Sequence, residues 1–556
     1  MKTVKFAPKL YTKSKPALHF CLQYVVNLYH SLPSLSLALG RPLGRLERIK
    51  HSYHGKDGTQ LVSTVVFIST STALTLERLQ KCLAYVSSSH PLLRARIVYE
   101  GGVPCWKEME NACVQPQVDQ TADWKRALEQ ECMKKIDTGK GPLWRVTYLP
   151  NAGTEFKDAA FKHHGALLLS FHPSVVSHPQ DVTTKVITKI LQALTNEYKI
   201  QPAGLIRTVA RYTFDQSQAL YNRFTDTVSY TTTSMKCITE TEQQLGVLAD
   251  AMPQPFESFI RPNIICQAIA EFTEIKLVKS ALKLWSSVTS YRPRNEFIKR
   301  IGIVQNIDPE IEGKTSLLTL QFSEHETQIL EQACRDNDVT LESMIYSAST
   351  LAMTDLIQSN IQPSLWDLVW PTSVLKHGRV QITRSVCDDV NVQTTCDDLV
   401  NYSYVIDKPY PFKEARSNHN LWQLAKSYQS STNSSGSIGV LMSYMTDALT
   451  NQLKTISELD LHSGYNAGRT DCILSFTNNG NHTLASDNPT AAKVNAVYSI
   501  TNEHHVGPIL SQGLAVVNNC LCLSTTYYTN VTTKSLTEKY LFKLKQFLFW
   551  IYESRK

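Results

Sequence analysis

The pattern of apolar and polar positions predicts alternating strands and helices in the first 200 residues. Apolar runs at 61–68, 143–149 and 165–170 have the length of buried strands. Such strands form a stable sheet when helices connect and cover them. We therefore expect the first part of the chain to be an α/β unit.

A helix is predicted between the first two of these strands. Thr75 is a suitable N-cap, and His90-Pro91 ends the pattern because proline cannot continue a helical hydrogen-bond ladder. One apolar face at helical spacing should pack on the sheet. Its residues are Leu76, Leu79, Leu83 and Val86.

The second half repeats this pattern. A strand at 315–320 precedes Ser323 and Glu326, which have the spacing of a capping box, and Thr340 can cap a second apolar helix. Further strands are predicted around 368–370, 402–406, 472–476, 494–500 and 514–528. Strands interleaved with helices twice over predict an α/β fold of two similar halves.

The chain length supports more than one unit. A chain of 556 residues is too long for one ordinary hydrophobic core. We expect four parts: a basic, amphipathic segment at 1–40, a first half at 41–200, a crossing linker and insert at 201–310, and a second half at 311–556.

Charge narrows the choice of partners only slightly. The net charge is +7, and basic residues are dispersed apart from a cluster near the N-terminus. This balance weakly favours anionic ligands or membrane surfaces, and without a nucleic-acid-binding motif we expect no nucleic acid partner. Segments 17–32 and 539–556 mix large apolar and basic side chains, as helices on a membrane surface do. Ordinary helices packed on the body are the alternative.

Cysteine usage bears on the compartment. The thirteen cysteines contain no Cys-x-x-Cys pair, which indicates reduced thiols. Four Asn-x-Ser/Thr sequons keep a lumenal location open. We expect a cytoplasmic monomer with peripheral contact to the endoplasmic reticulum or lipid droplets.

Six segments, in order and spacing, carry a family resemblance. Four of them lie in the first half: RPLGRLERIKH (41–51), SSHPLLRARI (88–97), GPLWRVTYLP (141–150) and LLLSFH (167–172). Two lie in the second half, at 320–353 and 521–548. Together they resemble the fungal alcohol O-acetyltransferase family, which belongs to the chloramphenicol-acetyltransferase-like superfamily with the condensation domains of peptide synthetases.

The resemblance implies two similar halves, built from mixed sheets flanked by helices, that meet along a central tunnel. In the family, the strand that ends in LSFH leads into a His-His-x-x-x-Asp loop, whose second histidine accepts the proton of the acceptor hydroxyl. Imidazole suits this task because it titrates near neutral pH. The resemblance thus implies acyl-CoA, chiefly acetyl-CoA, as co-substrate, a hydrophobic alcohol as acceptor, and no bound cofactor or metal.

The catalytic loop of this chain departs from that pattern. Placed without a gap, His172 takes the position of the first histidine, Pro173 that of the base, and Ser177 that of the aspartate. Proline has no ionisable group, so this placement removes the base. In a gapped alternative, His172 or His178 is the base and Asp181 is its partner. Spacing matters here because an imidazole displaced by an ångström can lose much of its effect.

Outside the catalytic loop, the sequence offers few further candidates for substrate-binding residues. The strand at 471–480 resembles the family's floor strand, where Ser475, Thr477 or Asn478 can donate to a developing oxyanion; a strand with a polar turn is the alternative. Arg145 is expected to bridge strand and loop as a structural residue. Glycine-rich phosphate loops and a Gly-x-Ser-x-Gly elbow are missing from the sequence, which leaves phosphoryl transfer and serine-hydrolase chemistry without support.

Two functions remain open from the sequence. The first is an acyl-CoA-dependent O-acyltransferase that uses a histidine general base. The second is a catalytically weakened or inactive member that binds a lipid or acyl thioester, or serves as a scaffold. Pro173 and Ser177 favour the second function.

Overall fold

The structure is a computed structural model, and it describes part of the chain. The described residues are 41–44, 47–48, 50–52, 54, 61–109, 114–176, 178–195, 313–360, 379–385, 403–411, 415, 420–434, 472–482, 491–502, 508–529 and 531–554. The predicted N-terminal segment, the linker at 201–310 and the strand around 368–370 lie outside these residues. The domain boundaries therefore stay predictions.

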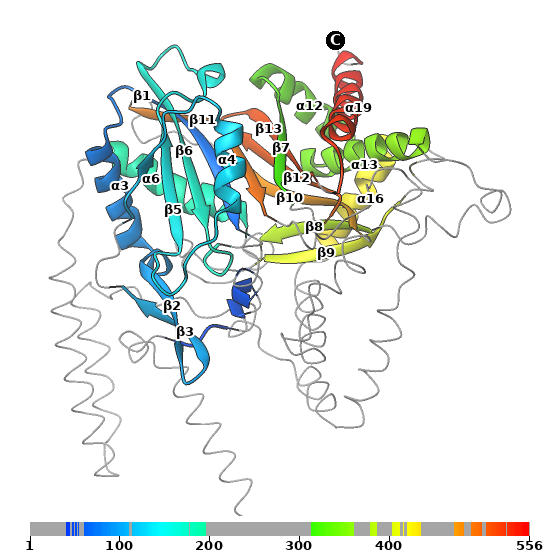
Figure 1. Cartoon of the computed structure of the whole chain (residues 1–556). Coiled ribbons are helices and arrows are strands. Elements are labelled where there is room, and N and C mark those ends of the chain that lie inside the picture. The colour runs from blue at the N-terminus through cyan, green and yellow to red at the C-terminus, as the bar shows by residue number, and fades with distance from the viewer. Residues whose placement is uncertain are drawn as a thin grey trace, which may run out of the picture.

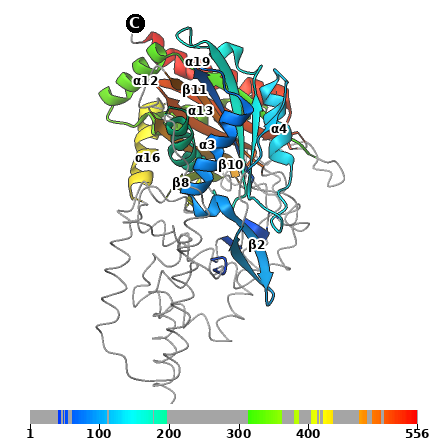
Figure 2. The same ribbon diagram turned by 90° about the vertical axis from the view of Figure 1, so that its left-hand side faces the viewer.

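The first half is a sheet with helices on both faces, as the sequence predicted (Figure 1). Its elements are β1 (Val62–Thr70), α3 (Leu76–Ser89), β2 (Ala95–Glu100), β3 (Val103–Glu108), β4 (Gln117–Val118), α4 (Trp124–Met133), β5 (Trp144–Leu149), β6 (His163–Phe171), α5 (Pro179–Asp181), a π-helical segment (Val182–Ile187) and α6 (Thr188–Thr195), with 3₁₀ turns at Pro91–Arg94 and Thr154–Phe156. Figures 1 and 2 show α3 on one face of the sheet and α4 on the other. The hairpin of β2 and β3 projects beyond the sheet.

The second half carries its helices on one side of a larger sheet (Figure 1). Its elements are β7 (Thr315–Gln321), α12 (Glu324–Asp336), α13 (Leu341–Asn360), β8 (Arg379–Ser385), β9 (Ser403–Pro409), α16 (Leu421–Ser434), β10 (Cys472–His482), β11 (Ala492–Thr501), β12 (Leu510–Val517), β13 (Cys520–Tyr528) and α19 (Lys534–Glu553). In the described residues the strand order of this sheet is β7-β13-β12-β10-β8-β9. Because β8, β10 and β12 run parallel while β7, β9 and β13 pair antiparallel, the sheet is mixed.

Local capping explains where several helices begin. Thr75 accepts a hydrogen bond from the backbone of Arg78 at the start of α3, and α3 ends at His90. The predicted capping box at Ser323 and Glu326 is present in both directions at the start of α12. These bonds satisfy backbone N–H groups that would otherwise lack partners in the first turn. Both helices begin where the sequence predicted, and Leu79, Leu83 and Val86 of α3 are buried as expected. The prediction for Leu76 is wrong: this residue is exposed in the first turn of α3.

One strand crosses from the second half into the sheet of the first. β11 pairs antiparallel with β1, so the first sheet has the order β11-β1-β6-β5-β4 among the described strands. The hydrophobic core of the first half accordingly includes Val494, Val497 and Leu317, which belong to the second half. The two halves therefore share a core as well as an interface.

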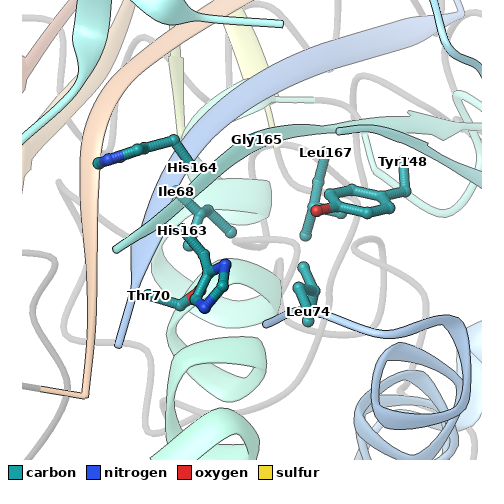
Figure 3. Close-up of a pocket in the computed structure, with 8 residues that line it drawn as sticks. All are labelled: Ile68, Thr70, Leu74, Tyr148, His163, His164, Gly165 and Leu167. Atoms are coloured by element: carbon teal, nitrogen blue, oxygen red, sulfur yellow. The ribbon is translucent and has the colours of Figure 1, made fainter. Parts of the chain in front are cut away.

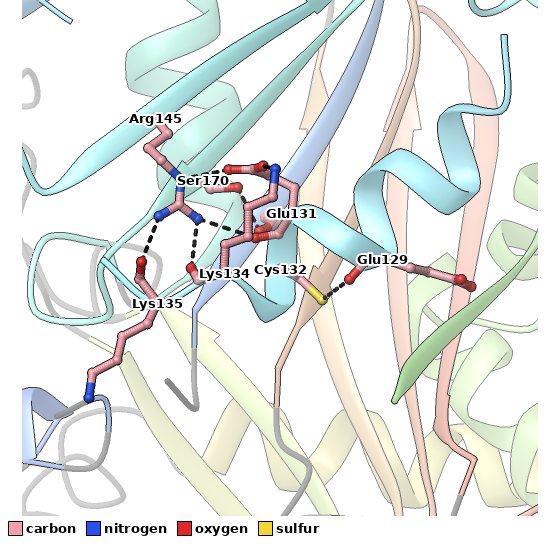
Figure 4. Close-up of polar contacts among 8 residues, drawn as sticks. Glu129, Glu131, Cys132, Lys134, Lys135, Arg145 and Ser170 are labelled. Carbon is pink, nitrogen blue, oxygen red and sulfur yellow. Dashed lines mark hydrogen bonds and ion pairs between the residues drawn. The ribbon is translucent and has the colours of Figure 1, made fainter. Parts of the chain in front are cut away.

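Hydrogen bonds and ion pairs also connect helix α4 to strand β5 and the first half to the second. Arg145 on β5 donates to the Glu131 carboxylate at 2.6 Å and to the backbone carbonyls of Lys134 and Lys135, which closes the end of α4 (Figure 4). The predicted structural role of Arg145 is thereby confirmed. Nearby, the Glu129 carboxylate of α4 accepts the backbone N–H of Leu317 on β7 at 2.7 Å. This bond crosses between the halves.

The described residues contain no helix with the length and apolar character needed to cross a membrane. The seven cysteines within them are free thiols.

Candidate active site

The loop that carries the candidate residues begins where β6 ends. β6 is held in register by β1 and β5, with Phe171 opposite both Val62 and Trp144. The backbone N–H of His172 then donates to the Leu143 carbonyl at 2.9 Å, and the chain turns back on itself. The strand therefore fixes the place of His172, and the turn buries the residues that follow it.

His172 is fully buried, with 0% of its surface exposed. Its Nδ1 accepts the backbone N–H of Ser174 at 3.1 Å, while its Nε2 has no hydrogen-bond partner among the described residues. A neutral imidazole has one N–H and one lone pair. Because Nδ1 supplies the lone pair, the hydrogen lies on Nε2, and this nitrogen is a donor rather than a base.

Two histidines that the sequence analysis did not select pack against His172. The ring of His54 lies edge-on at a centroid distance of 4.6 Å, and that of His51 lies at 5.7 Å. Both come from the helical residues between 47 and 54, far from β6 in sequence. No motif marks them, and their role becomes visible only when the chain folds. We call His51, His54 and His172 the histidine cluster.

Burial favours the uncharged form of His51 and His172. It lowers the pKa of His172 well below its usual value, and the nearby His54 and His51 lower this pKa further because neighbouring positive charges would repel. Burial also lowers the pKa of His51. In the described part of the chain, no three His, Cys, Asp or Glu residues are arranged to hold a metal ion.

The residues around Pro173 connect the loop after β6 to the segment that contains Glu47. Pro173, which the ungapped placement puts at the base position, is buried, and the Ser174 hydroxyl donates to the backbone carbonyl of Glu47 at 2.9 Å. The Glu47 carboxylate in turn pairs with Arg41 at 2.7 Å and accepts the indole N–H of Trp106. Ser177, which the same placement puts at the aspartate position, lies outside the described residues. This end of the loop is thus anchored to the segment that contains His51 and His54.

Both ring nitrogens of His178 form hydrogen bonds with the backbone. His178 is the N-cap of α5, where its Nδ1 accepts the N–H of Gln180 at 3.3 Å. Its hydrogen then lies on Nε2, which donates to the Thr383 carbonyl of β8 at 3.3 Å. Burial, reinforced by the charges of Lys50 and Arg384, lowers the pKa of His178 to about 4, although the Thr383 carbonyl opposes the shift. His178 therefore fastens the loop to the second half.

Asp181 does not form the pair with a histidine that the gapped alternative describes. It is buried, with 3% of its surface exposed, and its carboxylate lies 3.4 Å from the Lys185 ammonium one turn along the helix. His172 and His178 have no hydrogen bond to it. As placed in this structure, Asp181 supports the helix start.

The helix after the loop begins with π-helical turns over Val182–Ile187. A π-helical turn accommodates one more residue than an α-helical turn. The apolar face of this helix is nevertheless buried. Its residues are Val182, Val186, Ile187, Ile190 and Leu191.

The predicted substrate strand lies beside this loop, because α5 packs against β10. Ser475 is buried and Thr477 is half-buried; alternation along the strand puts both on the opposite face from Phe476, which stacks on Tyr346 in the second core. Asn478 donates to the Glu342 carboxylate at 3.1 Å and accepts from the backbone of Gly480. The Asn478 side chain is thus already occupied.

A small pocket lies at the far end of β6 (Figure 3). Its volume is about 10 Å³, room for about one water molecule. Tyr148, His163 and His164 contribute to its lining, and His164 Nδ1 is hydrogen-bonded to the Ser69 hydroxyl at 2.8 Å. An acyl chain or alcohol does not fit here, and the predicted tunnel between the halves stays a prediction.

The arrangement of the two halves defines the class of the fold. It is the mixed α/β, two-half fold of condensation domains and chloramphenicol-acetyltransferase-like acyltransferases. No family model and no curated protein matches the sequence.

Solved structures with this fold cover nearly the whole chain. The trichothecene 15-O-acetyltransferase TRI3 from Fusarium sporotrichioides is similar with a TM-score of 0.56 and 12% identity, over 92% of this chain and 95% of that one. The condensation domain of the monacolin K polyketide synthase MokA gives a TM-score of 0.52 and 11% identity, over 92% and 98%. The epimerization domain of tyrocidine synthetase B gives 0.52 and 11%, over 94% and 98%. At these identities the likeness establishes the fold.

Proposed function

We propose that this chain is an acyl-CoA-dependent O-acyltransferase that transfers an acyl group, chiefly acetyl, to the hydroxyl of a hydrophobic alcohol. The fold class supports acyl transfer, and the sequence segments resemble the fungal alcohol O-acetyltransferase family. The donor and acceptor are carried over from that resemblance.

The observation that carries the proposal is the Nε2–H of His172. A buried N–H without a partner is costly in a folded protein and is often explained by a ligand. A fixed N–H donor in a dry site also stabilises the oxyanion that develops on a thioester carbonyl. We assign this role to His172 in place of the base role that the sequence suggested.

The test is release of CoA thiol by the purified full chain with acetyl-CoA and a panel of hydrophobic alcohols. We expect release that depends on the alcohol, and a decrease of about 10²- to 10³-fold in kcat for His172→Gln, as for loss of one oxyanion donor. Absence of alcohol-dependent release from the wild-type chain would contradict the proposal.

A second candidate function is binding without turnover. Pro173 occupies the position of the family's base, and both ring nitrogens of His178 are engaged by the backbone. A member without a base can still bind a lipid or an acyl thioester. Saturable binding of acetyl-CoA measured by calorimetry, without CoA release, would select this function.

We further propose that the protein works as a monomer in the cytoplasm, in peripheral contact with the endoplasmic reticulum or lipid droplets. The exposed side chains Phe542 and Trp550 on α19 support the membrane contact. Large aromatic side chains next to lysines are typical of interfacial helices.

A further inference from the structure

We infer that His51 is the proton acceptor of the acyl-transfer reaction, acting beside the Nε2–H of His172. The inference rests on the proposed function and names the residue that takes the place of the missing base. It follows from the hydrogen-bond state and position of the two rings.

The first observation is that His51 has a free nitrogen of the right kind. Its Nδ1 is buried and has no hydrogen-bond partner among the described residues. Its Nε2 lies 3.1 Å from the hydroxyl of Tyr99. When Nε2–H donates to this hydroxyl, the lone pair lies on Nδ1. Tyr99 is 66% exposed, so its own hydrogen can point to water. His51 is therefore able to present a lone pair where His172 and His178 present N–H groups.

The second observation is the spacing of the two rings. The centroids of His51 and His172 are 5.7 Å apart, and the rings are tilted by 48°. In an acyl-transfer site, the attacking hydroxyl lies about 3 Å from the proton acceptor, and the carbonyl oxygen lies about 3 Å from the oxyanion donor. Two imidazoles in this contact can meet that requirement, with the acceptor hydroxyl at His51 and the thioester carbonyl oxygen at His172.

The third observation is the position of His51 at the edge of the histidine cluster. His51 is 6% exposed, whereas His54 and His172 are at 0%. The residue before it, Lys50, donates to the Ser403 hydroxyl on β9 at 3.3 Å. The segment thus reaches from the first half to the second, and boundaries between such units are common places for ligand sites.

In the proposed reaction, the acceptor hydroxyl gives its proton to His51 Nδ1 while its oxygen forms a bond to the thioester carbonyl carbon. The Nε2–H of His172 holds the negative charge on the carbonyl oxygen. The carbon–sulfur bond then breaks, and the leaving thiolate takes the proton back from His51. The products are an ester and CoA with a free thiol, and both histidines return to the neutral state.

The surroundings of His51 favour a neutral base. The titratable groups in ring contact with it are Tyr99 from β2 and His172 after β6, and Lys50 precedes it on its own segment. Burial lowers the pKa of His51, so the ring is uncharged at neutral pH. A neutral imidazole is the form that accepts a proton.

The experiment compares His51→Gln with a matched control, His164→Gln, which changes a half-buried histidine on β6. With acetyl-CoA and the best alcohol of the panel, we expect His51→Gln to lose about 10²- to 10⁴-fold in kcat, the usual contribution of a general base. Binding of acetyl-CoA should be unchanged, and His164→Gln should keep wild-type turnover. Wild-type turnover in His51→Gln would overturn the inference and leave the proposed function intact.

A second variant guards against a folding defect in His51→Gln. Tyr99→Phe changes an exposed residue and removes the oxygen that accepts from His51 Nε2. Because that oxygen stabilises the protonated ring, we expect the acid limb of the pH–kcat profile to move to lower pH. An unchanged profile would overturn the inference. A wild-type chain without alcohol-dependent CoA release would remove the proposed function and this role together.

Discussion

His172 and His178 show how a backbone contact decides the chemistry of a histidine. In both residues, a backbone N–H two positions later donates to Nδ1, so the hydrogen lies on Nε2. Residue type and spacing suggested a base at either position. The tautomer depends on a local turn, and one sequence alone gives little information about such a turn.

Acid should destabilise the protein through its buried histidines. In the unfolded chain a histidine takes up a proton near pH 6.5, whereas folded His178 does so only near pH 4. Between these values the unfolded state binds more protons, so stability rises with pH and falls on acidification. His178 alone should remove on the order of 3 kcal/mol of unfolding free energy between pH 6.5 and 4.

Urea unfolding at a series of pH values measures this loss. The variant His178→Asn should show a weaker pH dependence in the same window, because it has no imidazole to protonate. An unfolding free energy that stays constant from pH 6.5 to 4 would count against buried neutral histidines.

Removing Arg145 should destabilise the first half. Arg145→Ala would leave the Glu131 carboxylate, 4% exposed, without its 2.6 Å partner from β5 and would free the carbonyls at the end of α4. Loss of this partner should cost about 1–3 kcal/mol, because the buried carboxylate then keeps only the Lys134 ammonium. Lys134→Ala is the matched control, because Lys134 pairs with the same carboxylate from an exposed position. This control should change the unfolding free energy by less than about 1 kcal/mol.

Denaturant unfolding followed by circular dichroism distinguishes the two variants. Equal effects of Arg145→Ala and Lys134→Ala would contradict the structural role of Arg145.

At the scale of the element, the sequence predicted helices better than sheet edges. The capped helices α3 and α12 follow from local hydrogen bonds and a regular apolar face. The single strand predicted at 514–528 is wrong: it is the hairpin of β12 and β13, which turns at Asn518 and Asn519 with positive φ angles. Apolar residues continue on both sides of this two-residue turn, so hydrophobicity alone does not reveal it.

Other parts of the site depended on contacts distant in sequence. β8, which accepts the hydrogen bond of His178, was not predicted because Arg379–Ser385 contains only two apolar residues, Val380 and Ile382. The histidine cluster was missed because His51 and His54 lie more than a hundred residues from His172.

The outer face of α19 should bind membranes. Phe542 is 64% exposed and Trp550 is 60% exposed, and Lys539 and Lys545 are exposed near them. Aromatic rings enter the headgroup region, and lysines attract anionic lipids. We expect the full chain to float with vesicles of mixed zwitterionic and anionic phospholipid, and less so at high salt.

The double variant Phe542→Ser/Trp550→Ser should reduce vesicle binding by about tenfold or more, because each buried aromatic contributes roughly 1.5–3 kcal/mol. Leu76→Ser is the control, since Leu76 is exposed on α3. The melting temperature and vesicle binding of the Leu76→Ser variant should match those of the wild type. Unchanged vesicle binding by the double variant, or an equal loss of binding in Leu76→Ser, would argue against α19 as the membrane-binding face. Failure of the wild-type chain to bind vesicles would argue against membrane contact altogether.

At the scale of the molecule, the two halves depend on each other. β11 completes the sheet of the first half, and Glu129 holds β7 of the second. A fragment of residues 1–200 should therefore be insoluble when expressed alone, because the edge of β1 and part of its core are exposed. Co-expression with residues 201–556 should recover a soluble complex, detected by co-purification. A soluble, folded fragment 1–200 would show that β11 is dispensable.

The crossing of β11 also affects how the protein is made. A ribosome releases β1, β5 and β6 long before it releases residues 492–501, so the nascent sheet waits with an unpaired strand at its edge. Domains usually fold as units during synthesis, and an open edge invites pairing with other chains. Slow translation or lack of chaperones should therefore harm this protein during synthesis more than after its release.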